Sequence, residues 1–185
     1  MPMRSSIGRR ECHLTYNIRF GQLSEDLAMM HLKRKRKAFA YITHGRRILL
    51  LFHPDHPGAG IQVPAGTMRP GEAVEDSIRR EAAEETGLTC LEYVGVLGTQ
   101  RFDMRPFGRD ELHDRWFGLL RCHEHPPESW DHWETDPDDA PGERVRFTLR
   151  WSNLDDPLPE LFAGHGALIA TLRTSMTFDD NETQP

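Results

Sequence analysis

The chain has 185 residues, a length that fits one domain with terminal additions, and 37% of them are hydrophobic, enough for a single core. No apolar run approaches the roughly 18 residues of a transmembrane helix, so we expect no membrane span. The formal net charge of −6 disfavours long nucleic acids as partners, because general affinity for them comes from Lys and Arg on phosphates. The three cysteines form no CxxC pair, which predicts reduced thiols and a cytoplasmic protein.

The first 36 residues are predicted to form an N-terminal extension, in which Ser24 is a suitable N-cap for a short helix. A basic run, Lys33 to Lys37, follows. Two interpretations of this run stay open: a solvated strand edge or linker, and a patch that faces phosphate. We expect the main domain to span residues 37–176 and residues 177–185 to form a disordered tail.

Several segments of the main domain have the pattern of strands. Residues 39–43 and 47–52 are joined by a short Gly-containing turn, which predicts a hairpin. Because residues 48–52 are apolar on both faces, the second of these strands belongs in the middle of a covered sheet. Further strands are expected at residues 61–63, 91–100, 113–122 and 144–151, with helices over 72–86 and 158–174 and a long loop over 123–143. The order indicates an α/β fold with a mixed sheet and helices on its faces.

The helix over residues 72–86 breaks the usual separation of apolar and charged faces. At about 100° per residue, Val74, Ile78 and Ala82 form its core-facing stripe. On the same projection Glu85 falls between Val74 and Ile78, and Glu81 falls just beside them. These acids would therefore be partly buried, which opposes their ionisation.

Charge adds to this cost, because Glu81 repels both Glu84 and Glu85 at helical spacing, and the last turn disfavours anions. A divalent cation would relieve these penalties, and clustered carboxylates suit Mg²⁺ or Mn²⁺. On the helix alone the alternative is a Glu-rich surface helix with ion pairs to Arg79 and Arg80.

The loop that precedes this helix favours the metal-binding interpretation. Gly66 and Gly71 allow tight turns and a close approach of the backbone to a ligand. The loop leads to a helix N-terminus, where free N–H groups favour phosphate. Glu72 lies in a favourable place for an acid, and its spacing to Arg80 predicts a tie between the two ends of the segment.

The complete pattern resembles the Nudix box. Its fixed positions are all present: Gly66, five residues, Glu72, seven residues, Arg80-Glu81-Ala82, one residue, Glu84-Glu85, one residue, Gly87-Leu88. A pattern of this length is far more specific than a lone glycine motif. The flanking segments fit the same family over residues 37–174.

The resemblance implies an α/β/α sandwich with a central mixed sheet and a loop–helix–loop catalytic motif. It implies metal-dependent hydrolysis of a diphosphate linkage in a nucleoside diphosphate joined to another group. By analogy with the family, Glu81, Glu84 and Glu85 would bind Mg²⁺ or Mn²⁺ with help from a backbone carbonyl near Gly66. Arg80 and Glu72 would orient the site.

The general base and the substrate contacts are less well defined. Glu81 is one candidate for the base, and ordinary loop acids that could also serve are Asp103, Asp110, Glu111 and Asp114. Guanidinium groups that could grip phosphate are those of Arg101, Arg105, Arg109 and Arg115, unless they only balance nearby acids. Phe102 could stack on a base, although an aromatic side chain here could equally belong to the core.

No subfamily signature identifies the substrate, so nucleoside triphosphates, nucleotide sugars and dinucleotides all stay open. Two other functions are also considered. One is a nucleotide-binding sensor without catalysis, which the intact box disfavours. The other is hydrolysis at the 5′ end of RNA, which only the basic run supports. Many members of the family are homodimers, but nothing in the sequence defines an interface.

Overall fold

The computed structural model describes residues 31–135 and 142–182, the last six of these by their backbone alone. The chain divides into two compact units, residues 1–33 and 34–185. The elements described here belong to the second unit, except for Lys33, the first residue of the first strand. The short helix expected after Ser24 falls mainly outside the described residues. The first strand begins at Lys33, so residues 33–36 of the predicted extension are part of the sheet.

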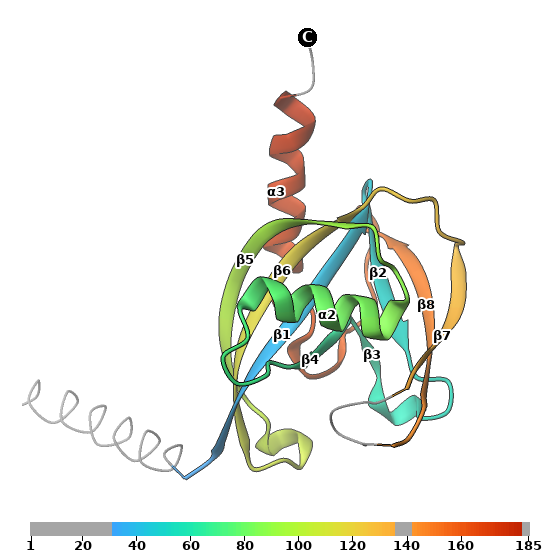
Figure 1. The fold of residues 1–185 in the computed structure, drawn as a ribbon. Helices are drawn as coiled ribbons and strands as arrows, with labels where there is room; N and C mark the ends of the chain where they lie inside the picture. The colour runs from blue at the N-terminus through green and yellow to red at the C-terminus, as the bar shows by residue number, and fades with distance from the viewer. Residues whose placement is uncertain (1–30, 136–141, 183–185) are drawn as a thin grey trace, which may run out of the picture. The chain divides into compact units, whose positions relative to one another are not determined.

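One eight-stranded sheet dominates the structure (Figure 1). Its main path has the order β5-β6-β1-β2-β8-β7, with β3 added to β2 and β4 added to β1. The strands are β1 (Lys33–His44), β2 (Arg47–Phe52), β3 (Ile61–Gln62), β4 (Ala65–Thr67), β5 (Leu91–Asp103), β6 (Glu111–Cys122), β7 (Ser129–Glu134) and β8 (Val145–Asn153). The helices are α2 (Val74–Thr86) and α3 (Ile169–Glu182), with single 3₁₀ turns η1 (Pro57–Ala59), η2 (Arg105–Phe107) and η3 (Phe162–Gly164).

The sheet is mixed, as predicted. The expected hairpin is present as the antiparallel pair β1 and β2, and β2 continues antiparallel to β8. Contacts between β1 and β6 run in the same direction along both strands: Arg34 meets Asp114, and Thr43 further on donates to the carbonyl of Leu120. Residue numbers that rise together on both strands mean that β1 and β6 are parallel.

Alternation along β1 places one core on each face of the sheet. Ala38 and Ala40 pack in a cluster with Ile78 of α2, whereas Phe39 packs in a second cluster with Leu172 of α3. Because successive side chains of a strand point to opposite faces, one strand contributes to both cores. Helices on both faces give the α/β/α sandwich that the sequence predicts. The apolar run of β2 lies in the middle of this sheet, and its residues 48–51 are buried.

Three segments differ from the sequence-based expectation. Strand β7 lies within the segment that was predicted to be a long loop. The strand was not predicted because its inward side chains, Trp130, His132 and Glu134, do not form an apolar pattern. Residues 65–67 also form a strand, β4. The last helix begins at Ile169 instead of Leu158, after a turn in which Ala163 adopts φ 44°. Its backbone is helical to Glu182, where a disordered tail was expected.

No helix in the described part of the chain is long and apolar enough to cross a membrane. Among the cysteines, Cys90 is exposed and Cys122 is buried, and both are free thiols. Cys12 lies outside the described residues.

The packing of α2 on the sheet depends on a glycine of β6. A Cβ atom added to Gly118 would lie 2.5 Å from Cδ1 of Ile78. We predict that Gly118→Ala lowers the free energy of unfolding by about 1–3 kcal/mol through overpacking. Gly58→Ala is the control, since nothing lies within 4 Å of a Cβ atom there. Urea denaturation checks this, and equal stability of the two variants would contradict the packing argument.

Candidate active site

The catalytic-motif helix α2 carries acids in its last turn, which contains no basic residue of its own. The helix begins after Ala73, has Glu75 and Asp76 in its first turn, and has no basic residue in its last turn. Gly87 ends it with φ 76° and donates its N–H to the carbonyl of Ala83. The first turn suits the helix dipole, whereas Glu84 and Glu85 near the C-terminus do not.

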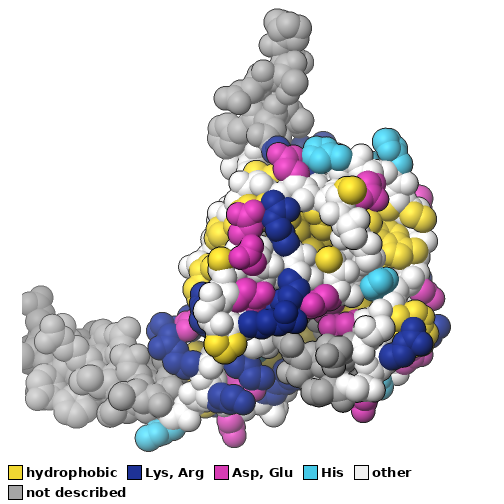
Figure 2. All heavy atoms as spheres, viewed as in Figure 1, with side chains coloured by type: hydrophobic (Ala, Val, Ile, Leu, Met, Phe, Trp, Pro, Cys, Tyr) yellow, Lys and Arg dark blue, Asp and Glu magenta, His cyan; other side chains and the backbone are white. Residues whose placement is uncertain are grey.

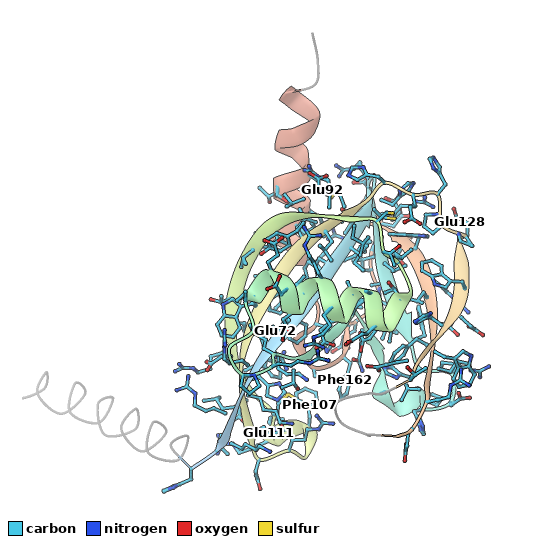
Figure 3. All side chains as sticks on the ribbon, viewed as in Figure 1. Glu72, Glu92, Phe107, Glu111, Glu128 and Phe162 are labelled. Atoms are coloured by element: carbon cyan, nitrogen blue, oxygen red, sulfur yellow. The ribbon has the colours of Figure 1, made fainter. Side chains whose placement is uncertain are left out.

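The predicted tie between the ends of the motif is present. Arg80 donates from Nε to Oε1 of Glu72 at 2.8 Å and from Nη2 to the carbonyl of Thr67 at 3.0 Å. Both charged side chains are largely buried. The hydrogen bonds from Arg80 lower the pKa of Glu72 to about 2, with a smaller contribution from the backbone N–H of Arg69. This ion pair fixes the loop before α2 against the helix (Glu72 is labelled in Figure 3).

Glu81 is buried beneath strand β4, with only 3% of its surface exposed. Nη1 of Arg80 lies 2.8 Å from its Oε1. A Cβ atom added to Gly66 would lie within 2.0 Å of its Oε2, so the carboxylate occupies the space that any side chain at position 66 would need. The motif glycine is therefore required for the close approach of the helix to β4.

Glu85 lies one turn further along α2 and accepts the backbone N–H of Ala65 at 2.9 Å. Burial raises its pKa well above the ordinary value, and the negative charges of Glu81 and Glu134 raise it further. Glu134, which ends strand β7, was not among the residues predicted for the site. The structure thus brings three carboxylates from two elements to one place.

Glu84 shares Nη1 of Arg80 with Glu81. Its carboxylate accepts from Arg80 at 2.8 Å and lies 3.5 Å from Arg69. Its side chain is 39% exposed and does not line the cavity that Glu81 and Glu85 share. Figure 2 shows the resulting mixture of acidic and basic side chains on the face where α2 lies. Of the predicted metal ligands, Gly66, Glu81 and Glu85 line the cavity. Glu84 does not line it, although its carboxylate and that of Glu81 both lie 2.8 Å from Nη1 of Arg80.

A cavity of about 450 Å³ is lined by Glu81, Glu85 and Glu134, which form its acidic end. Cationic and imidazole groups around it come from Lys37, His53, Arg109, His113, Arg115 and His165. Its aromatic walls are Phe39, Phe107, Phe147 and Phe162. Oxygen ligands, positive charge and aromatic rings thus occupy one site.

Lys37 belongs to the basic run, and the structure separates its members. Lys37 lines the cavity and donates to Oγ1 of Thr67 at 3.0 Å. The side chains before it have other partners: Arg34 pairs with Asp114, Lys35 with Glu111, and Arg36 lies over Trp116. Only one member of the run among residues 33–37 therefore faces the cavity.

Of the arginines predicted to grip phosphate, Arg109 and Arg115 line the cavity; Arg109 is exposed, whereas the other is the buried Arg115. Its side chain is 2% exposed, and its guanidinium lies 3.8 Å from the centre of the Phe102 ring. Nη1 donates to the carbonyl of Ala163 at 2.6 Å. Burial lowers its pKa to about 10. Because Arg115 covers Phe102, that ring does not line the cavity.

The other two predicted arginines, Arg101 and Arg105, do not line the cavity. Arg101 pairs with Asp114, and Arg105 pairs with Asp103. The acids proposed as alternative bases are similarly placed: none of Asp103, Asp110, Glu111 and Asp114 lines the cavity. Burial opposes ionisation of Glu111, but hydrogen bonds from Lys35 and His113 bring its pKa down to about 2.

The acids that line the cavity fit a hard divalent cation, because carboxylate and carbonyl oxygens are its preferred ligands. Their crowding leaves buried negative charge that a cation would neutralise. In the part of the chain that the structure describes, no three His, Cys, Asp or Glu side chains lie close enough together to hold a metal ion as they stand.

The tie between Glu72 and Arg80 makes stability depend on pH. Because the folded-state pKa of Glu72 is about 2, well below the ordinary value of 4.5, its ionisation stabilises the fold above pH 4.5. We predict that Glu72→Gln lowers the free energy of unfolding by about 2 kcal/mol at pH 7. Denaturant unfolding between pH 3 and 7 should show this difference shrinking as the pH falls below 4.5. A difference that stays constant would contradict the ion-pair explanation.

Comparison with known proteins identifies the family and the fold of the chain. The family model described as NUDIX domain matches residues 33–172, more than half of the chain. A MutT NUDIX hydrolase from Burkholderia pseudomallei is 22% identical, with a TM-score of 0.56, and the match covers 76% of this chain and 98% of that one. The NUDIX domain of Shewanella oneidensis NrtR, solved with ADP ribose, is 18% identical, with a TM-score of 0.52 and coverage of 77% and 88%. No curated protein sequence matches the chain. The chain, with its complete motif and the fold that positions it, belongs to the NUDIX family of hydrolases.

Proposed function

We propose that the chain hydrolyses the diphosphate linkage of a nucleoside diphosphate joined to a second group, with Mg²⁺ or Mn²⁺ as its cofactor. The observation that carries this proposal is the meeting of Glu81, Glu85 and Glu134 at one end of a cavity that has aromatic walls. A diphosphate needs a cation beside it, and a nucleobase needs a flat apolar surface, so the two ends suit the two parts of the substrate.

Glu81, Glu85 and Glu134 would hold the cation together with a backbone carbonyl near Gly66. When bound, a divalent ion lowers the pKa of water and neutralises phosphate charge. Glu84 has its own ion pairs with Arg80 and Arg69, so we assign it to supporting these arginines rather than to the cavity.

The remaining residues would bind the phosphates and move a proton. Lys37 and Arg109 place positive charge in the cavity, where phosphate oxygens could accept hydrogen bonds from them. Glu134 comes from a different element than the motif acids, and its charge acts on Glu85. We assign Glu134 as the carboxylate that accepts the proton of the attacking water.

Phe107 and Phe162 are assigned to the nucleobase. Their ring centroids are 5.2 Å apart, and both rings line the cavity (Figure 3). Phe107 is 40% exposed, so part of its ring is accessible to a ligand. ADP-ribose is a suitable first test compound, since the Shewanella oneidensis neighbour was solved with it.

Two alternatives are less well supported. A sensor without catalysis would not need the paired buried acids, whose desolvation is costly unless they have a chemical task. Action on RNA was supported only by the basic run, of which Lys37 alone faces the cavity. We expect the enzyme to act on small nucleotides in the cytoplasm, and a homodimer is compatible with this scheme.

The carboxylates provide the first kinetic test. We predict that Glu81→Gln, Glu85→Gln and Glu134→Gln each lower kcat by about a hundredfold or more, because each loses a charge needed at the reacting phosphate. Release of phosphate or AMP from a nucleotide panel with Mg²⁺ or Mn²⁺ measures this. Glu92→Gln is the matched control, since Glu92 is exposed, pairs with His123 and lies at the opposite end of the sheet (Figure 3). Near-normal turnover in the three cavity variants would contradict the proposal.

The aromatic wall provides a separate test of substrate binding. We predict that Phe107→Ala raises KM for nucleotide substrates by about three- to tenfold, from the loss of one stacking contact, and changes kcat little. Val94→Ala is the control, because Val94 is an exposed apolar residue that does not line the cavity. Inorganic tripolyphosphate, which has no base, should be insensitive to the change. An equal rise in KM for tripolyphosphate would contradict the stacking role of Phe107.

A further inference from the structure

Strand β7 supplies two side-chain donors to the C-terminal end of α2. Nε1 of Trp130 donates to the carbonyl of Thr86 at 3.0 Å. Nε2 of His132 lies 3.1 Å from the carbonyl of Glu84. Because a carbonyl oxygen can only accept, this nitrogen carries the hydrogen. Two carbonyls of the last turn, which have no partner inside a helix, are thus satisfied from another element.

The two contacts have different positions relative to the carboxylates. The carbonyl of Glu84 belongs to the peptide group that joins Glu84 to Glu85. A hydrogen bond to this carbonyl fixes the peptide plane from which the Glu85 side chain extends. The carbonyl of Thr86 lies beyond both acids, so the bond from Trp130 holds the end of the helix and not the base of Glu85.

The imidazole of His132 is itself held in place. A Cβ atom added to Gly87 would lie 2.8 Å from Nδ1 of His132, so the ring occupies the space left by the motif glycine. Two residues further along the same face of β7, Glu134 enters the cavity beside Glu85. The contact of His132 with Glu84 therefore sets the register between the acids of α2 and the acid of β7.

We propose that His132 is a positioning residue, which holds Glu85 and Glu134 in the relative placement that a divalent cation requires. This inference rests on the proposed function, because it assumes that these acids receive the cation. Groups that orient metal ligands in this way contribute strongly to metal affinity, although they do not touch the metal.

The test measures Mn²⁺ binding to the purified full chain without substrate, by electron paramagnetic resonance of the free ion. We predict that His132→Leu weakens binding about tenfold, whereas His132→Gln, which keeps an N–H donor, stays within about threefold of the original chain. Trp130→Phe is the matched control, since it removes one carbonyl contact from the same helix end but keeps an aromatic ring. It should lower the melting temperature as His132→Leu does and leave Mn²⁺ affinity within about twofold.

Two results would overturn the positioning role: unchanged Mn²⁺ affinity in His132→Leu, or an equal loss in Trp130→Phe, which would make both contacts merely structural. An original chain that binds no Mn²⁺ would overturn both this inference and the proposed function. An original chain that binds Mn²⁺ in a His132-dependent way but hydrolyses no nucleotide would overturn the proposed function alone.

Discussion

Two acids on successive turns of one helix, Glu81 and Glu85, lie against the backbone of strand β4, and the other features of the site follow from this crowding. Glu81 fills the space beside Gly66, and Glu85 accepts the N–H of Ala65. Their mutual repulsion and desolvation raise the pKa of Glu85. Such an arrangement is costly in an empty site and favourable with a cation, which is how strain is commonly stored at functional sites.

The surrounding structure holds this arrangement at each end of α2. At the N-terminal end, Arg80 ties the helix to Glu72 and to the carbonyl of Thr67. At the C-terminal end, the donors come from Trp130 and His132 of β7, where the helix itself has no basic residue. These contacts restrict the positions of both ends of the helix and therefore of the acids that it carries.

Sequence reasoning succeeded where local periodicity decides the structure. The hairpin of β1 and β2, the buried placement of Glu81 and the pairing of Glu72 with Arg80 all follow from spacing within short segments. It failed for β7, because Trp130, His132 and Glu134 point inward to meet α2 and the cavity. A strand whose buried face is mostly polar resembles a loop, and Glu134 was missed with it.

The ion pairs between side chains of different segments could not be predicted from the sequence either. The four arginines of residues 101–115 looked equivalent in the sequence. Asp114 and Asp103 pair with Arg101 and Arg105, whereas Arg109 and Arg115 line the cavity. The sequence left open whether the basic run faces phosphate. Lys37 could have been singled out within it, because its side chain lies on the same strand face as the apolar Phe39. The base and substrate contacts thus depend on tertiary neighbours that no spacing rule supplies.

The central claim is that the buried acids are placed to receive a divalent cation. A ligand that binds only the folded state stabilises it in proportion to the logarithm of its concentration, so melting in the presence of Mn²⁺ measures the claim without any substrate. The account predicts that the melting temperature of the original chain rises steadily with Mn²⁺ concentration, and that this rise is lost in Glu85→Gln. An equal rise in both proteins, or no rise in either, would contradict it.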